Sequence, residues 1–210
     1  MRTQTRWVLC IGLITMALLL SGCLYNIFQT AAMIRGGDVG LAVGSGLVNM
    51  GFDDDPLWMV TPQARVAFGL SDTVNLGVQS GVGIPLTTGS PGWMGAVGDI
   101  KVSILEDPGP LAVAVGAGGG FSVEWVGWGV FGQILLDSNL RAFPVFAAYQ
   151  LAAPLSGGGR RLWHHLAVGW RWRLSEQAQM LLQVDLAVPL ISFGVAVDIG
   201  HWAPIGKPAD

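Results

Sequence analysis

The chain has 210 residues, a formal net charge of −3 and only 12% charged residues, whereas 51% of its residues are hydrophobic and its mean hydropathy is +0.53. A soluble domain carries about a quarter charged residues, so this chain has too few charges to cover a water-exposed surface of its size. The length suits one domain. The sequence contains no basic run or stripe, which excludes a nucleic-acid-binding surface.

The first 22 residues have the layout of a secretory signal peptide. Arg2 and Arg6 precede an apolar run from Trp7 to Leu20, and small residues follow that run. Cys10 lies within the apolar run and Cys23 lies just after it, so neither is placed to form a disulfide in the mature domain. We therefore predict that residues 1–22 are removed on export.

The sequence Leu20-Ser21-Gly22-Cys23 resembles the lipobox of bacterial lipoproteins. The resemblance implies cleavage before Cys23 and acylation of its thiol and new amine, with palmitate as an expected group. Leu24 follows Cys23 instead of Asp, which by the same resemblance favours sorting to the outer membrane. Two or three acyl chains would anchor the chain stably, because each buried methylene contributes about 0.8 kcal/mol. The alternative is an ordinary signal peptide with a chance cysteine.

Residues 23–36 are predicted to be a lipidated tether, which ends at Gly36-Gly37. From Asp38 onward, apolar and polar residues alternate with a period of two, which indicates extended strands. Several of these strands have the length of about 9–11 residues that a tilted strand needs to cross the hydrocarbon of a membrane. The strand candidates are 38–47, 58–70, 73–83, 93–105, 111–120, 127–136, 141–152, 162–174, 178–188 and 191–200.

The alternation is clearest between Leu162 and Ile199. One face is continuously apolar there and the other carries the charges, so we interpret the apolar face as meeting lipid and the polar face as lining a lumen. Tight connections such as Ser71-Asp72 alternate with longer ones such as 49–57, as in outer-membrane barrels, although Pro189-Leu190 breaks the rule. The prediction is an all-β, closed antiparallel transmembrane β-barrel over residues 37–200. It is an up-and-down meander of about ten strands, or alternatively eight, with a tail at 201–210.

The tryptophans are predicted to lie at the two rims of this barrel. Two aromatic girdles are expected where rings meet lipid headgroups. Those beside the predicted long loops are Trp58, Trp93, Trp125, Trp128 and Trp163, and those near the opposite rim are Trp172 and Trp202.

The alternation also predicts which charged side chains point into the lumen. Isolated charges in a narrow lumen would be costly, so we expect them to pair with one another. Small barrels are filled by side chains, so we expect a largely filled lumen. The predicted charge network consists of Asp38, Arg65, Asp99, Lys101, Arg171, Arg173, Asp185 and Asp198.

Chemistry-bearing motifs are weak. His165 falls near the outer end of a predicted strand and Ser156 in the loop before it, but no carboxylate can be placed behind the histidine from the sequence. Asp53-Asp54-Asp55 lacks the spacing of a calcium loop, and Gly157-Gly158-Gly159 lacks the Lys-Ser/Thr of a phosphate loop. We therefore expect no catalytic residue, no metal and no cofactor.

Together these patterns predict a barrel of the bacterial outer membrane, lipid-anchored through Cys23, with a structural or envelope-associated role and no turnover. The alternatives are a narrow pore or transporter for a small polar solute, a lipid-modifying enzyme, and a periplasmic lipid-binding barrel with its apolar face inward. The expected partners are outer-membrane lipid and, during biogenesis, the barrel-assembly machinery. The sequence identifies no small-molecule ligand.

Overall fold

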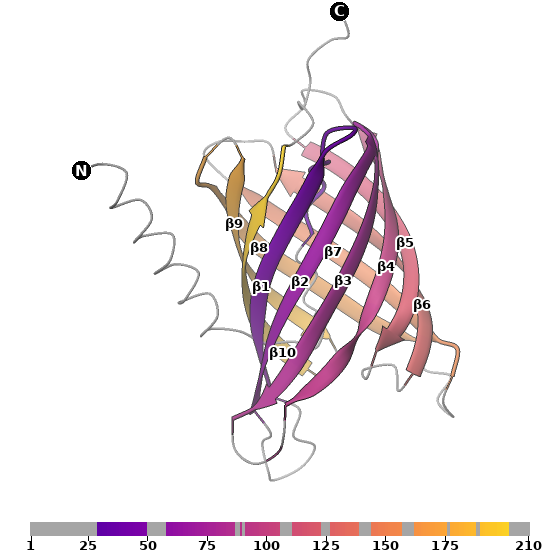
Figure 1. Cartoon of the computed structure of the whole chain (residues 1–210), viewed down its shortest axis with the longest axis vertical. Helices are drawn as coiled ribbons and strands as arrows, with labels where there is room; N and C mark the ends of the chain where they lie inside the picture. The colour runs from indigo at the N-terminus through magenta and orange to yellow at the C-terminus, as the bar shows by residue number, and fades with distance from the viewer. Residues whose placement is uncertain are drawn as a thin grey trace, which may run out of the picture.

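The computed structural model describes residues 29–49, 58–86, 89, 91–105, 111–122, 127–138, 144–156, 162–175, 177–187 and 190–201. Within these ranges, ten strands form a closed antiparallel barrel (Figure 1). The strands are β1 (Val39–Asn49), β2 (Trp58–Ser71), β3 (Val74–Pro85), β4 (Gly92–Leu105), β5 (Leu111–Ser122), β6 (Gly127–Ser138), β7 (Val145–Pro154), β8 (Trp163–Arg173), β9 (Ala178–Ala187) and β10 (Leu190–Ile199).

Each strand pairs with its neighbours along the chain, and β1 pairs with β10 to close the barrel. At this closure Leu41 lies opposite Ile199 and Val48 lies opposite Ser192. The predicted all-β meander of ten strands is confirmed, and the alternative of eight strands is wrong. The predicted strand bounds differ from the observed ones by two residues or fewer, except that β7 begins at Val145 instead of 141.

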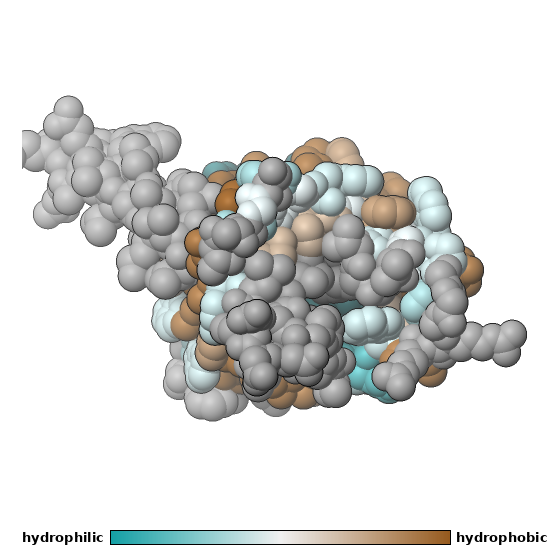
Figure 2. Space-filling model, turned by 90° about the horizontal axis from the view of Figure 1, so that it is seen from below, coloured by the Kyte–Doolittle hydropathy of each residue, from teal (hydrophilic) through white to brown (hydrophobic). Residues whose placement is uncertain are grey.

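Side chains alternate between the inside and the outside of the barrel. In β6, Phe131, Gln133 and Leu135 are buried, whereas the residues between them, Gly132 and Ile134, are exposed. In β8, Leu166, Val168 and Trp170 are 39%, 45% and 44% exposed. Viewed from one end, apolar residues lie around the circumference and paler, more polar ones lie within it (Figure 2). The exterior of the barrel is therefore apolar.

The two ends of the barrel differ in the length of their connections. We call the end where β1 begins and β10 finishes the short-turn end, and the opposite one the long-loop end. The difference is smaller than predicted, because two connections at the short-turn end are not tight. The short-turn end carries 72–73, 106–110, 139–144 and 174–177, and the long-loop end carries 50–57, 86–91, 123–126, 155–162 and 188–189.

Glycines on the inner wall make room for the large side chains inside the barrel. A Cβ added at Gly77 would overlap the guanidinium of Arg65, and one added at Gly169 would lie 2.7 Å from the ring of Phe146. Glycine weakens a strand, so it is usually kept where another group approaches closely. The 31 glycines of the chain are thus explained in part by the crowding of the lumen.

Candidate functional site

A segment ahead of β1 lies inside the barrel (Figure 1). We call residues 29–35 the luminal segment. The side chains from Gln29 to Ile34 are all buried, at 2–7% exposure, and Arg35 is exposed at the short-turn end. Part of the stretch that the sequence predicts to be a tether therefore occupies the lumen. Neither alternation nor charge in the sequence indicates this position.

Polar groups of the barrel wall hold the backbone of the luminal segment. Lys101 Nζ donates hydrogen bonds to the carbonyl oxygens of Thr30, at 3.1 Å, and Ala32, at 2.7 Å. The side-chain amide of Asn75, in the orientation that satisfies both its groups, donates to the carbonyl of Ile34 at 3.1 Å and accepts from its N–H at 2.8 Å. The segment thus obtains from side chains the backbone partners that a strand obtains from its neighbours.

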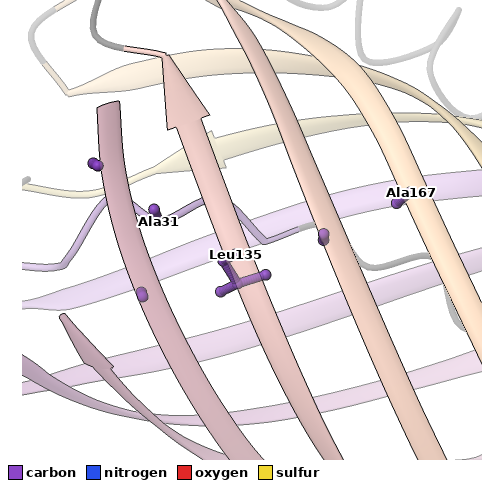
Figure 3. Close-up of a cluster of buried hydrophobic side chains, with 6 residues drawn as sticks. Ala31, Leu135 and Ala167 are labelled. Carbon is purple, nitrogen blue, oxygen red and sulfur yellow. The ribbon is translucent and has the colours of Figure 1, made fainter. Parts of the chain in front are cut away.

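The deeper part of the segment is held by one amide contact and by apolar packing. Gln133 Nε2 donates to Gln29 Oε1 at 3.2 Å. Ala31 packs in a buried cluster whose larger member is Leu135 of β6 (Figure 3). The cluster also contains Ala112, Ala114, Ala148 and Ala167. Small side chains on three strands therefore form the recess that receives Ala31.

Glycines shape the wall where the segment leaves the lumen. Added Cβ atoms at Gly40 and Gly200 would lie 2.5 and 2.9 Å from Ile34 Cδ1, so both glycines seat this side chain. At Gly69, a Cβ would overlap the carbonyl oxygens of Ile34 and Arg35. Gly37 has φ of 85°, a conformation that favours glycine, at the bend into β1. The wall is complementary in shape to the segment.

Two of the predicted lumen charges form a buried ion pair with each other. The guanidinium of Arg65 makes two hydrogen bonds to the carboxylate of Asp99, of which the one from Nη2 to Oδ1 is 2.9 Å. The two residues belong to β2 and β4, which are separated by β3, and Arg65 reaches across Gly77 of β3. This is a bidentate arginine–carboxylate pair, the strongest hydrogen-bonding geometry that a buried guanidinium can form with a carboxylate.

The other buried charges have partners that were not predicted. Lys101 is held by main-chain carbonyls, as described above. Asp198 accepts a hydrogen bond from Gln179 Nε2 at 3.1 Å, and Asp185 lies 2.8 Å from His165 Nε2. Arg171 Nη1 donates to Asp137 Oδ2 at 2.5 Å. Asp137 was not predicted to face the lumen, because the predicted strand over 127–136 ends one residue before it, whereas β6 continues to Ser138.

Asp38 and Arg173 do not join these buried groups. Asp38 lies at the short-turn end, 3.4 Å from His201 Nδ1. Arg173 is exposed. Cys23, Asp53-Asp54-Asp55 and Gly157-Gly158-Gly159 lie outside the described residues.

The long-loop half of the lumen contains an apolar cluster beside buried polar residues such as Thr61, His165 and Asp185. Met94, Val97, Phe131 and Ala152 form a buried cluster there, against which Met59 and Trp163 pack. Trp163 therefore faces inward, contrary to its prediction as part of a girdle. Outside, the tryptophans exposed near the rims are Trp58, Trp93, Trp128 and Trp172, while Trp125 and Trp202 lie outside the described residues.

Little free space remains beside the luminal segment. A cavity of about 30 Å³ lies between the segment and the wall, lined among others by Arg65, Lys101 and Asp198. This volume accommodates about one water molecule. This cavity beside the segment is too small for a hydrated ion.

The predicted candidates for chemistry are not brought together. The Ser156 hydroxyl accepts a hydrogen bond from the backbone N–H of Trp128 at 2.6 Å, whereas His165 contacts Asp185 inside the barrel. Asp185 supplies the carboxylate that the sequence could not place behind this histidine. Among the described residues, no three His, Cys, Asp or Glu side chains gather as metal ligands would.

Comparisons with known proteins locate similar folds. No protein-family model matches the chain, and no curated protein is significantly similar to it. The N-terminal β-barrel domain of Pseudomonas aeruginosa OprF is similar at 12% identity, over 78% of this chain and 97% of that one, with a TM-score of 0.34.

Two further structures resemble the chain to a similar degree. A barrel from the de novo design of transmembrane β-barrels is 12% identical over 80% of this chain and 98% of its own, with a TM-score of 0.34. The KdgM porin is 9% identical over 78% and 99%, with a TM-score of 0.37. Similarity at this level assigns no function. In the described ranges, no helix is long and apolar enough to cross a membrane.

Proposed function

We propose that this chain is an outer-membrane β-barrel, lipid-anchored through Cys23, with a closed lumen and a structural or envelope-associated role without turnover. The observation that carries the proposal is the division of the barrel into an apolar exterior and an interior that the chain's own luminal segment partly occupies. The partners proposed are membrane lipid and, during folding, the barrel-assembly machinery.

The exterior supports insertion into a bilayer. Large apolar side chains are exposed on strands around the whole barrel, including Leu76 at 40%, Ile134 at 48% and Phe193 at 58%. A soluble monomer rarely exposes a contiguous apolar patch larger than a few hundred Å². The strands have 10–14 residues, enough for the roughly 9–11 that a tilted membrane-spanning strand requires.

The interior supports a closed barrel instead of an open pore. Charged side chains there are matched by one another, by amides or by main-chain carbonyls, and the luminal segment leaves a cavity of about 30 Å³ beside it. A narrow pathway for a small polar solute would require this segment to leave.

The anchor is tested by labelling the full chain with a palmitate analogue in a Gram-negative host. The lipobox supports acylation of Cys23, so the wild type and Cys10→Ser should be labelled and Cys23→Ser should not. Cys10→Ser is the matched control, because Cys10 lies in the predicted signal peptide. Labelling of Cys23→Ser equal to that of the wild type would refute the anchor.

The closed lumen is tested in planar lipid bilayers. The intact chain should show no conductance, and a variant with residues 29–34 replaced by Gly and Ser should conduct. Steady conductance by the intact chain would replace the closed barrel with the pore alternative.

A further inference from the structure

We infer that the chain passes through the lumen from the long-loop end before β1 begins, so that Cys23 emerges at the long-loop end. The location of the acyl chains rests on the proposed lipid anchor, but the path of the chain does not. The occupant inferred for the long-loop half of the lumen, beside the apolar cluster around Phe131, is residues 24–28.

The direction of the luminal segment supports this path. Arg35 lies at the short-turn end, where its N–H donates to the carbonyl of His201 at 2.8 Å. Further back, Ala32 and Thr30 are held by Lys101, which lies four residues before the end of β4. Gln29 is held by Gln133, the seventh of twelve residues in β6. From Arg35 back to Gln29, the residues of the luminal segment therefore lie progressively farther from the short-turn end.

The described residues pack closely around this segment on two sides. On one side Ala31 packs directly against the cluster around Leu135. On the side that faces Arg65, Lys101 and Asp198, the remaining cavity measures about 30 Å³. A space for about one water molecule cannot hold a second length of polypeptide.

The length of the chain is sufficient to reach the long-loop end. Cys23 precedes Gln29 by six residues, which span up to about 20 Å when extended. Gln133, the partner of Gln29, is likewise six residues from Gly127, where β6 begins at the long-loop end. Those six residues rise about 3.3 Å each along a strand tilted by about 35–45°, so the distance along the barrel axis is about 15 Å.

Residues 24–28 and part of the wall in the long-loop half of the lumen are both apolar. On one side of its wall, the long-loop half of the lumen presents Met59, Met94, Phe131 and Trp163, while Thr61, His165 and Asp185 are buried polar residues of the same half. The sequence before Gln29 is Leu24-Tyr25-Asn26-Ile27-Phe28, which is mostly apolar. Burying these side chains against an apolar lining removes both surfaces from water. Longer loops face the cell exterior in outer-membrane barrels, so acyl chains on Cys23 would reach the outer leaflet.

The path is tested with epitope insertions in the full chain. A short epitope is inserted after Leu24, which leaves the lipobox and its following residue intact. The same epitope within 50–57 reports on the long-loop end, and the epitope after Asp210 reports on the short-turn end. The epitope after Leu24 should bind antibody on intact cells, as the 50–57 epitope does, whereas the Asp210 epitope should bind only after permeabilisation. An epitope after Leu24 that behaves like the one after Asp210 would overturn the inference.

Palmitate labelling of the same variants separates the two proposals. Surface binding without label would reject the anchor and support the path, and label with an epitope detected only after permeabilisation would support the anchor and reject the path. If the insertion variant does not fold, disulfide cross-linking replaces it. Ile27→Cys should then cross-link with Met94→Cys in the long-loop half, and cross-linking with Ala114→Cys in the short-turn half instead would overturn the path.

Discussion

The interior of this barrel depends on how each buried charge is matched. Arg65 pairs with Asp99, while Lys101 is satisfied by two main-chain carbonyls of the luminal segment. Removing an ion from water costs several kcal/mol unless a partner replaces the lost hydration. The energetic weight of each partner can therefore be measured by removing one member of a pair.

Removing one member of the Arg65–Asp99 pair should destabilise the barrel strongly, whereas replacing both members with apolar residues should change its stability little. Asp99→Asn leaves the guanidinium buried without a counter-charge, and we expect a loss of about 3–5 kcal/mol in the free energy of unfolding. The double variant Arg65→Met/Asp99→Leu should be within about 1 kcal/mol of the wild type, because neither ion remains. Urea titration of the protein folded in lipid vesicles measures both. A double variant less stable than Asp99→Asn would contradict this account.

Lys101 should stabilise the barrel through the luminal segment. Lys101→Met removes both hydrogen bonds to the carbonyls of Thr30 and Ala32, and we expect a loss of about 1.5–3 kcal/mol. The control is Ile100→Val, at the neighbouring position, whose side chain is 42% exposed on the exterior. Equal effects of the two substitutions in the same urea titration would show that Lys101 does not hold the segment.

The alternation in the sequence identified the inward positions of Arg65, Asp99, Lys101, Asp185 and Asp198, but not their partners. Alternation along a strand specifies whether a side chain faces the lumen or the exterior. It does not specify which side chains of other strands lie at the same height in the barrel. Arg65 and Asp99 meet across β3 because Gly77 leaves space between them. The pairing of Asp185 with His165 likewise depends on the register of β8 and β9, in which Ala167 lies opposite Asp185.

At the scale of elements, strands and luminal segment differ in how far the sequence predicts them. The ten strands follow from their period of two. The luminal segment, Gln29 to Arg35, forms no strand and only a single β-bridge at Ile34, so it carries no periodic signal. It is recognisable only from its surroundings, since Gly40, Gly69 and Gly200 leave the space that it fills.

The absence of a side chain at Gly69 should be required for the luminal segment to pack against β2. In Gly69→Ala, the added Cβ collides with the carbonyl oxygens of Ile34 and Arg35, and we expect a loss of about 1–3 kcal/mol. Gly132→Ala is the matched control, because the nearest atom to its added Cβ, the carbonyl oxygen of Gly116, is 4.0 Å away. Thermal unfolding of both variants, followed by the gel mobility of unheated samples, makes the comparison. A Gly69→Ala barrel as stable as Gly132→Ala would mean that the segment is not tightly packed there.

For the molecule as a whole, the low charged fraction and the alternation together predicted an apolar exterior. They could not predict that residues 29–35 occupy part of the lumen. A short stretch that mixes apolar and polar residues is equally compatible with a tether in solution. Only closure of the barrel at a particular width defines the space that the segment occupies.

The cost of a charge on the exterior should depend on its depth. Val168 is the sixth of eleven residues in β8 and is 45% exposed, whereas Leu174 lies just beyond the last residue of β8 and is 44% exposed. We expect Val168→Arg to reduce the free energy of folding into vesicles by about 2–4 kcal/mol, and Leu174→Arg by about 0–1 kcal/mol. Equal costs at the two positions would be inconsistent with a bilayer around the middle of β8.

The central claim is that the apolar surface faces acyl chains while the interior is packed. Membrane fractionation of the full chain, followed by electrophoresis of unheated and boiled samples, tests it most directly. We expect the protein in the outer-membrane fraction, released only by detergent, with a compact, faster band that shifts on boiling. Release without detergent, with identical mobility before and after boiling, would contradict the claim.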